Sequence, residues 1–175
     1  MPTTLPAPAL QPELIRLAKT RPLWPVKAAM CYLEMDEDEI IERVESQEFQ
    51  FAFDLGSLDT TARDVRIFRG SIEYFALHAL HGHVALHARE AAADLPDVIT
   101  AILPGFQWHI DGKILTKTIR ARELADAFVC SSKHILDLIN EGSLHSLTDP
   151  RRGRNGSPRV TEASAREFLT GRRIT

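Results

Sequence analysis

The chain has 175 residues, of which 44% are hydrophobic and 26% charged, with a formal net charge of −3. These values are typical of a water-soluble globular protein of one or two small domains. No run of about 18 apolar residues is present, and the N-terminus lacks a basic segment followed by an apolar one, so we expect a cytoplasmic protein with no membrane span or secretory signal.

The charge is divided unevenly along the chain. Residues 1–90 contain nine Lys or Arg and 14 Asp or Glu, a net charge of −5, whereas residues 91–175 contain 12 and 10, a net charge of +2. Acidic residues concentrate in Glu34–Glu48, and arginines concentrate in Arg151–Arg159. Since nucleic acids attract positive charge, only the second half is a candidate for binding them.

The composition of residues 1–21, which is rich in Pro, Thr and Ala, predicts a flexible N-terminal arm. Within this arm a short helix is expected over Pro12–Lys19, since proline is favoured at the first helical position. The two cysteines, Cys31 and Cys130, form no metal-ligand pattern and are expected to be reduced thiols.

Residues 22–80 predict a first domain made of two short helices, a hairpin and a closing helix. The second helix begins with Asp36 and has Glu39 three residues later, the pattern of a capping box. The hairpin is expected because apolar and polar residues alternate in part on either side of the polar stretch Gly56–Asp64. The predicted elements are helices Pro25–Leu33 and Asp36–Ser46, strands Phe49–Asp54 and Val65–Phe68, and helix Ser71–Ala79.

Residues 81–117 predict a connecting segment. Helices are expected over Leu77–Ala93 and Pro96–Leu103, followed by a type I′ hairpin at Asp111-Gly112, within which Trp108 packs. The histidines between residues 78 and 87 include a pair at zinc-ligand spacing. However, Val84 stands where a metalloprotease needs its glutamate, so no metal is expected.

Residues 118–175 repeat the order of elements found in residues 22–80. Gly142 is expected to end the second helix in a left-handed conformation. The predicted elements are helix Arg120–Phe128, turn Val129–Ser131, helix Ser132–Glu141, strands Leu144–Leu147 and Arg159–Thr161, and helix Glu162–Thr170.

The similarity between the two segments extends to an internal repeat. Val26–Phe49 aligns with Ala121–Leu144 at an offset of 95, and Val65–Phe75 aligns with Pro158–Phe168 at an offset of 93. The apolar positions coincide in the pairs Ala29 and Leu124, Leu33 and Phe128, Ile40 and Ile135, Val44 and Ile139, and Phe49 and Leu144. One fold used twice with different surfaces is therefore expected.

The second copy resembles the excisionase-type, MerR-like winged helix-turn-helix family of bacterial and phage DNA-binding proteins, over about Ile119–Gly171. The residues that carry the resemblance are Glu123-Leu124-Ala125, Ser131, Ile135, Leu138, Ile139, Glu141-Gly142-Ser143-Leu144, Arg159-Val160 and Phe168-Leu169. Val129 stands in place of the family's turn glycine, and Leu136-Asp137 in place of its Tyr/Arg pair. The first copy resembles the family more weakly, with Glu34 at the glycine position.

The resemblance implies an α+β, mainly α fold of two winged helix-turn-helix-like domains joined by a helical linker and a β-hairpin. Residues 118–175 would be the DNA-binding domain and residues 22–80 a degenerate acidic copy. The N-termini of helices bind phosphate groups. Lys and Asn side chains read base edges, whereas flexible arginines contact the DNA backbone or the minor groove. The candidate DNA-binding residues are Ser131, Ser132, Lys133, His134 and Asn140 on the recognition helix and Arg151, Arg152, Arg154, Asn155 and Arg159 in the wing.

The first recognition helix is a poor reader of DNA because it carries acids into the field of the phosphates. The stretch Asp36–Glu48 is either a solvated face or a contact surface for a protein partner. We expect double-stranded DNA as the partner, a homodimer on paired half-sites, no cofactor, no metal and no enzymatic activity. The role could be that of a transcriptional regulator or an excisionase-like recombination factor. The alternatives are a protein-interaction module or a phage DNA-packaging small subunit that keeps the fold without operator recognition.

Overall fold

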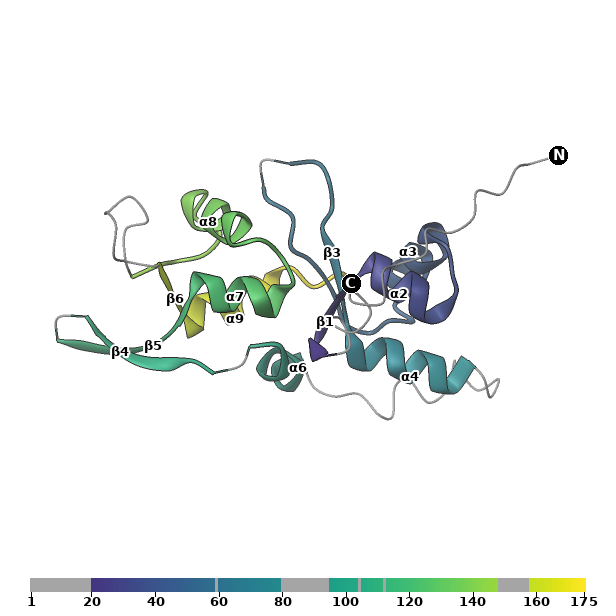
Figure 1. The fold of residues 1–175 in the computed structure, drawn as a ribbon, viewed down its shortest axis with the longest axis horizontal. Coiled ribbons are helices and arrows are strands. Elements are labelled where there is room, and N and C mark those ends of the chain that lie inside the picture. The colour runs from purple at the N-terminus through teal and green to yellow at the C-terminus, as the bar shows by residue number, and fades with distance from the viewer. Residues whose placement is uncertain (1–19, 59, 80–94, 104, 112, 148–157) are drawn as a thin grey trace.

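The computed structural model describes residues 20–58, 60–79, 95–103, 105–111, 113–147 and 158–175. Within these ranges the chain is an α+β structure with seven helices and two three-stranded antiparallel sheets, in two halves (Figure 1). We call the described residues 20–79 the N-terminal unit and those from 95 onward the C-terminal unit. The helix expected over Pro12–Lys19 and most of that over Leu77–Ala93 lie outside the described residues.

The N-terminal unit places two short helices against a small sheet of strand order β1-β3-β2. The predicted capping box is confirmed: Asp36 Oδ1 accepts from Glu39 N at 2.8 Å, and Glu39 Oε2 accepts from Asp36 N at 2.9 Å. Ile40 and Val44 face inward from the second helix and are buried. The elements are β1 (Leu23–Pro25), α2 (Val26–Leu33), α3 (Glu37–Glu45), β2 (Ala52–Asp54), β3 (Val65–Phe68) and α4 (Arg69–Ala79).

The C-terminal unit has the same plan with an extra helix and strand at its start. Its sheet has the order β4-β5-β6. Here too the second helix of the pair buries an apolar face, formed by Ile135 and Leu138. The elements are α6 (Leu95–Ile102), β4 (Gln107–Asp111), β5 (Ile114–Arg120), α7 (Ala121–Phe128), α8 (Ser132–Asn140), β6 (Arg159–Thr161) and α9 (Glu162–Gly171).

The repeat seen in the sequence is also present in the backbone. Strand β1 pairs with β3 in the register Leu23–Phe68, Trp24–Ile67 and Pro25–Arg66, and β5 pairs with β6 in the register Thr118–Thr161, Ile119–Val160 and Arg120–Arg159. The second set of pairs follows from the first when 95 is added to the residue numbers in β1 and 93 to those in β3, the offsets of the sequence alignment. The residues with a left-handed backbone conformation also match: Glu34 (φ 57°) corresponds to Val129 (φ 55°), and Gln47 (φ 61°) corresponds to Gly142 (φ 83°).

The structure differs from the predicted elements mainly in the strands. The short strand β1 was not expected, and β5 runs directly into α7 and pairs with β6, so the β4–β5 hairpin belongs to the C-terminal sheet rather than to a separate connector. In place of a strand over Leu144–Leu147 there is one bridge, from Ser146 to Val160. Such short strands are defined by the partner they pair with, which local sequence does not specify.

The N-terminal unit has an apolar cluster of its own, which includes Trp24, Ile40 and Ile67, and a second cluster is shared by the two units. Leu23, Phe53 and Leu55 of the N-terminal unit are fully buried in the same cluster as Leu124 and Phe128 of the C-terminal unit. The chain end strengthens this connection, because Ile174 N donates to Ala52 O at 2.9 Å and Asp54 N donates to Arg172 O at 2.8 Å. Burying a Leu or Phe side chain contributes about 1.5–3 kcal/mol. The two units are therefore parts of one folded body.

Candidate nucleic-acid interface

The pair of helices α7 and α8 is joined by a tight turn. Helix α7 ends as Val129 adopts a left-handed conformation with φ of 55°, and the N–H of Cys130 donates back to Ala125 O at 3.0 Å. Ser131 then caps α8, since its Oγ accepts from His134 N at 3.1 Å. This cap confirms Ser131 as the start of the second helix and leaves the first turn of α8 facing solvent.

The candidate residues on α8 are mostly exposed. Ser131, Ser132, Lys133 and Asn140 all lie on the solvent side of the helix. Arg159 is half-buried on β6, opposite Arg120. The four remaining candidates lie outside the described residues: Arg151, Arg152, Arg154 and Asn155. The described part of the site is thus the exposed start of α8, with two serines and a lysine, together with Asn140 at the last residue of this helix and Arg159 on β6.

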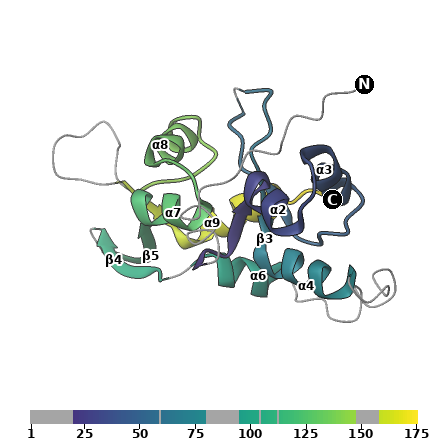
Figure 2. The ribbon, with the colours of Figure 1, turned by 45° about the vertical axis from the view of Figure 1, so that its right-hand side comes forward.

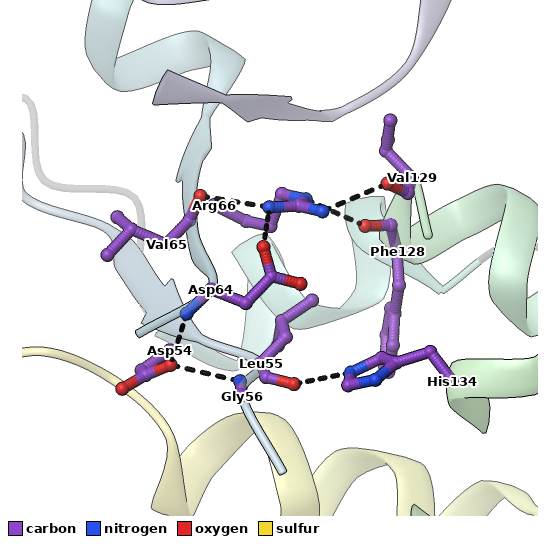
Figure 3. Close-up of polar contacts among 9 residues, drawn as sticks. All are labelled: Asp54, Leu55, Gly56, Asp64, Val65, Arg66, Phe128, Val129 and His134. Carbon is purple, nitrogen blue, oxygen red and sulfur yellow. Dashed lines mark hydrogen bonds and ion pairs between the residues drawn. The ribbon is translucent and has the colours of Figure 1, made fainter. Parts of the chain in front are cut away.

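His134 has a partner inside the protein. Its Nε2 lies 2.6 Å from Leu55 O, the carbonyl of a residue at the base of the loop between β2 and β3 (Figure 3). This loop, which we call the 55–64 loop, rises beside α8 in both views of the fold (Figures 1 and 2). A DNA contact by His134 stays a prediction, and such a contact would compete with the bond to Leu55.

A groove of about 630 Å³ separates α8 from the 55–64 loop. His134, Asp137 and Asn140 line it from the helix, and Thr60 and Arg63 line it from the loop. These three helix residues recur every three positions, so they share one face. That face of α8 is therefore bordered by the N-terminal unit, whereas Lys133 lies at the exposed start of the helix.

Two side chains near α8 have shifted pKa values. Burial raises the pKa of Glu141, but hydrogen bonds from Ser57, Ser143 and the N–H of Leu58, with the charge of Arg172, together outweigh burial, so that its pKa is lowered. Burial is also the largest influence on Cys130 and raises the pKa of its thiol to about 12. Glu141 thus stays charged at neutral pH, and Cys130 stays protonated and unreactive.

Sequence reasoning missed Arg66, which crosses between the units. Its guanidinium donates to Phe128 O at 3.3 Å and to Val129 O at 3.1 Å (Figure 3). The only available signal was the repeat, in which Arg66 aligns with Arg159. That alignment indicates a shared position, but it does not indicate that Arg66 reaches the other unit.

The corresponding face of the N-terminal unit is acidic. Asp36, Glu37, Asp38 and Glu42 are exposed on or beside α3. Two ion pairs lie at its end, Arg63 with Glu45 at 3.1 Å and Arg43 with Glu48 at 2.9 Å. Because most of these carboxylates point into solvent, this helix would repel phosphates.

The β4–β5 hairpin exposes large apolar side chains. Trp108 is 62% exposed, so the expectation that it packs within the hairpin is wrong, although Lys117 Nζ lies 5.3 Å from its ring centroid. The other exposed apolar side chains of the hairpin are Ile110, Ile114 and Leu115. The hairpin lies at the end of the molecule remote from α3 (Figure 1).

Comparison with protein-family models, with curated proteins and with solved structures found no match. The residues that the structure describes contain no group of three or more His, Cys, Asp or Glu placed to hold a metal ion, and no helix among them could cross a bilayer. Most of the histidine cluster around His83 lies outside the described residues.

Proposed function

We propose that this chain is a non-enzymatic, sequence-specific DNA-binding protein of the winged helix-turn-helix type, and that its C-terminal unit reads the DNA. The observation that carries the proposal is the exposed first turn of α8, where Ser131, Ser132 and Lys133 stand at a helix N-terminus. Free N–H groups and the helix dipole favour a phosphate there, and Lys133 adds a positive charge. Asn140, two turns later, is suited to pair with adenine.

The arginines that follow α8 in the sequence support the same proposal. Arg159 opens strand β6, and Arg151, Arg152 and Arg154 precede it in the chain. In a winged helix-turn-helix protein such a basic segment contacts the DNA backbone or the minor groove beside the recognition helix. The N-terminal copy does not qualify, because acids occupy the positions equivalent to Ser132 and Lys133.

A salt titration of binding to duplex DNA tests the proposal. If about four cations neutralise phosphates, log K should fall with log salt concentration at a slope near −3 to −4, since each phosphate contact contributes about −0.9. Replacing Arg151, Arg152 and Arg154 by Ala should bring the slope to about −1. Lys27→Ala is a matched control, because Lys27 is an exposed lysine of the N-terminal unit. Absence of binding at about 50 mM salt, or a slope unchanged in the triple variant, would contradict the proposal.

A DNA reader of this kind would serve as a transcriptional regulator or an excisionase-like recombination factor. Paired half-sites in DNA further favour a homodimer, which sedimentation at tens of micromolar would test. The second candidate function is a protein-interaction module, favoured by the exposed Trp108 and Ile110 on the hairpin. Loss of a protein complex in Trp108→Ser, together with no DNA binding by the wild type, would favour this second function.

A further inference from the structure

A single hairpin of the N-terminal unit contacts the α7–α8 pair at three points. Arg66 on β3 reaches the turn between the helices, Leu55 reaches the first turn of α8, and Ser57 reaches Glu141 directly after α8 (Figure 3 shows the first two). These contacts join residues 62 to 84 positions apart in the chain. The helix proposed to read DNA is thus held at both ends and at its turn by the other unit.

Arg66 contacts the helix pair at the strained turn between the two helices. Carbonyl groups at the end of a helix lack intrahelical partners, and the helix dipole places partial negative charge on them. Arg66 donates to two such carbonyls, those of Phe128 and Val129, and an ion pair with Asp64 orients its guanidinium. Val129 is β-branched and left-handed with φ of 55°, a combination that is strained and persists only when its surroundings hold it.

The other two contacts hold α8 itself. His134 Nε2 lies 2.6 Å from Leu55 O at the start of the helix. At its end, the carboxylate of Glu141 accepts from the hydroxyl of Ser57, and Leu58 N lies 3.5 Å from Glu141 Oε1. Helix α8 therefore cannot rotate about its axis without breaking a bond to the N-terminal unit.

The hairpin is itself rigid enough to act as a support. Asp54 Oδ1 accepts from Gly56 N at 2.9 Å and from Asp64 N at 3.0 Å, which closes the base of the 55–64 loop. Leu55, between these residues, is fully buried in the same cluster as Ile135 of α8. Packed apolar side chains thus lie directly beneath the polar contacts. Arg66 is itself largely buried, since only 12% of its side chain is exposed.

We infer that the N-terminal copy of the fold positions the DNA-reading helix, with Arg66 as the principal positioning residue. Arg66 fixes the turn at Val129 and so the angle at which α8 meets the major groove. This inference rests on the proposed function, and it gives a role to a copy whose own helix repels DNA. Its role is structural support across the boundary between the units.

The test compares Arg66→Met, which keeps most of the aliphatic stem, with Arg69→Met. Arg69 begins α4, directly after β3, and pairs with Glu73 inside the N-terminal unit. Two quantities are measured on the full chain: amide hydrogen exchange over residues 129–140 in the free protein, and the dissociation constant for duplex DNA as a function of salt. We expect faster exchange and binding weaker by about tenfold or more for Arg66→Met, because a hydrogen bond to a charged group is worth about one decade in an equilibrium constant. Arg69→Met should change neither quantity by more than about twofold.

The salt slope separates positioning from direct contact. Arg66→Met should leave the slope unchanged, since Arg66 bonds to carbonyls and Asp64; a slope lower by about 0.9 would mean that Arg66 itself neutralises a phosphate, which overturns the inference. Arg66→Lys should recover part of the affinity. Normal affinity in Arg66→Met, with wild-type DNA binding intact, also overturns the inference while leaving the proposed function standing. Absence of DNA binding by the wild type overturns both.

A second pair of variants covers the case in which Arg66→Met fails to fold. Val129→Gly removes the strain of a left-handed β-branched residue, so the double variant Arg66→Met/Val129→Gly should fold and recover DNA binding relative to Arg66→Met. Glu141→Gln weakens the end of α8 alone and should raise exchange there with a smaller loss of affinity. Wild-type affinity and exchange in Glu141→Gln, together with a folded double variant whose DNA binding stays weak, would overturn the inference.

Discussion

Helices α3 and α8 occupy equivalent positions in the two units, and they have the same length and the same kind of cap but differently charged first turns. Both follow a left-handed residue, both begin with a side-chain cap, and both bury an isoleucine at the same step. Yet the first turn of α3 is acidic, whereas that of α8 carries Ser132 and Lys133. The backbone of such a helix pair is therefore set by a few apolar, cap and turn positions, and the exposed face can change sign without disturbing it.

The comparison of the two units also shows which residues need contacts from elsewhere in the protein to keep their backbone conformation. The matching left-handed residues are Glu34 and Val129 in the turn between the two helices of each unit, and Gln47 and Gly142 after the second helix. Only one of the four is glycine, so packing and hydrogen bonds impose this conformation in the other three. At Val129 part of that support comes from Arg66 of the other unit. The C-terminal unit thus depends on the N-terminal unit at the place where its own sequence is least suited to the turn.

The largest expected effect is the loss of stability when a buried isoleucine is truncated in each copy, and it shows whether the two copies are packed equally well. Ile40→Ala and Ile135→Ala each remove a fully buried side chain at equivalent positions. Each should lower the free energy of unfolding by about 2–5 kcal/mol, and because the units share a core both should shift a single transition. Urea denaturation followed by circular dichroism measures this. Two separate transitions, each sensitive to one variant, would show that the units unfold independently.

The next effect concerns the left-handed residues after the second helices. A left-handed conformation costs a non-glycine residue about 1–2 kcal/mol. Gly142→Ala, with φ of 83°, should therefore destabilise the protein, and Gln47→Gly, with φ of 61°, should stabilise it by a smaller amount. Thermal unfolding of both variants gives the two signs. Destabilisation by Gln47→Gly would mean that the Gln47 side chain makes contacts worth more than the backbone strain.

The helix caps should have equal effects on stability and unequal effects on function. Asp36→Ala and Ser131→Ala each remove one cap bond, at 2.8 and 3.1 Å, and each should cost about 1 kcal/mol. Only Ser131→Ala should also weaken DNA binding, since Asp36 belongs to the acidic copy. Equal losses of DNA affinity in the two variants would contradict the assignment of reading to α8.

The smallest expected effect is a dependence on acidic pH. The pKa of Glu141 is lowered in the folded protein. Its contribution to stability is therefore complete above the ordinary glutamate pKa of about 4.3 and is lost as the pH falls through the lower folded value. Glu141→Gln should flatten this part of the stability profile in acid titrations followed by fluorescence. Glu45→Gln, on the exposed face of the N-terminal unit, serves as the control, and an equal flattening there would contradict the role of Glu141 in joining the units.

Much of the fold could be predicted because the signals are local. The spacing of Ile40 and Val44 indicates the buried face of α3, and Asp36 with Glu39 indicates where that helix begins. The predicted β4–β5 hairpin is also present, but its turn was misplaced, because Asp111 is the last residue of β4 and pairs with Ile114. The strand β1 could not be predicted, because its three residues form a strand only by pairing with β3. The exposure of Trp108 was likewise missed, since an apolar residue in an alternating run looks the same whether its face is covered or open.

By itself the sequence determined that one fold occurs twice and that the two copies have opposite charge, because apolar spacing, caps and charge are properties of neighbouring residues. Only the tertiary structure decided that the copies are joined through Leu55, Arg66 and Glu141. The reason is physical: an arginine bonding to carbonyls 62 and 63 positions away leaves no periodic or local trace in the sequence. What holds α8 in place is thus a property of the folded chain, whereas what α8 presents to solvent can be read directly from its residues.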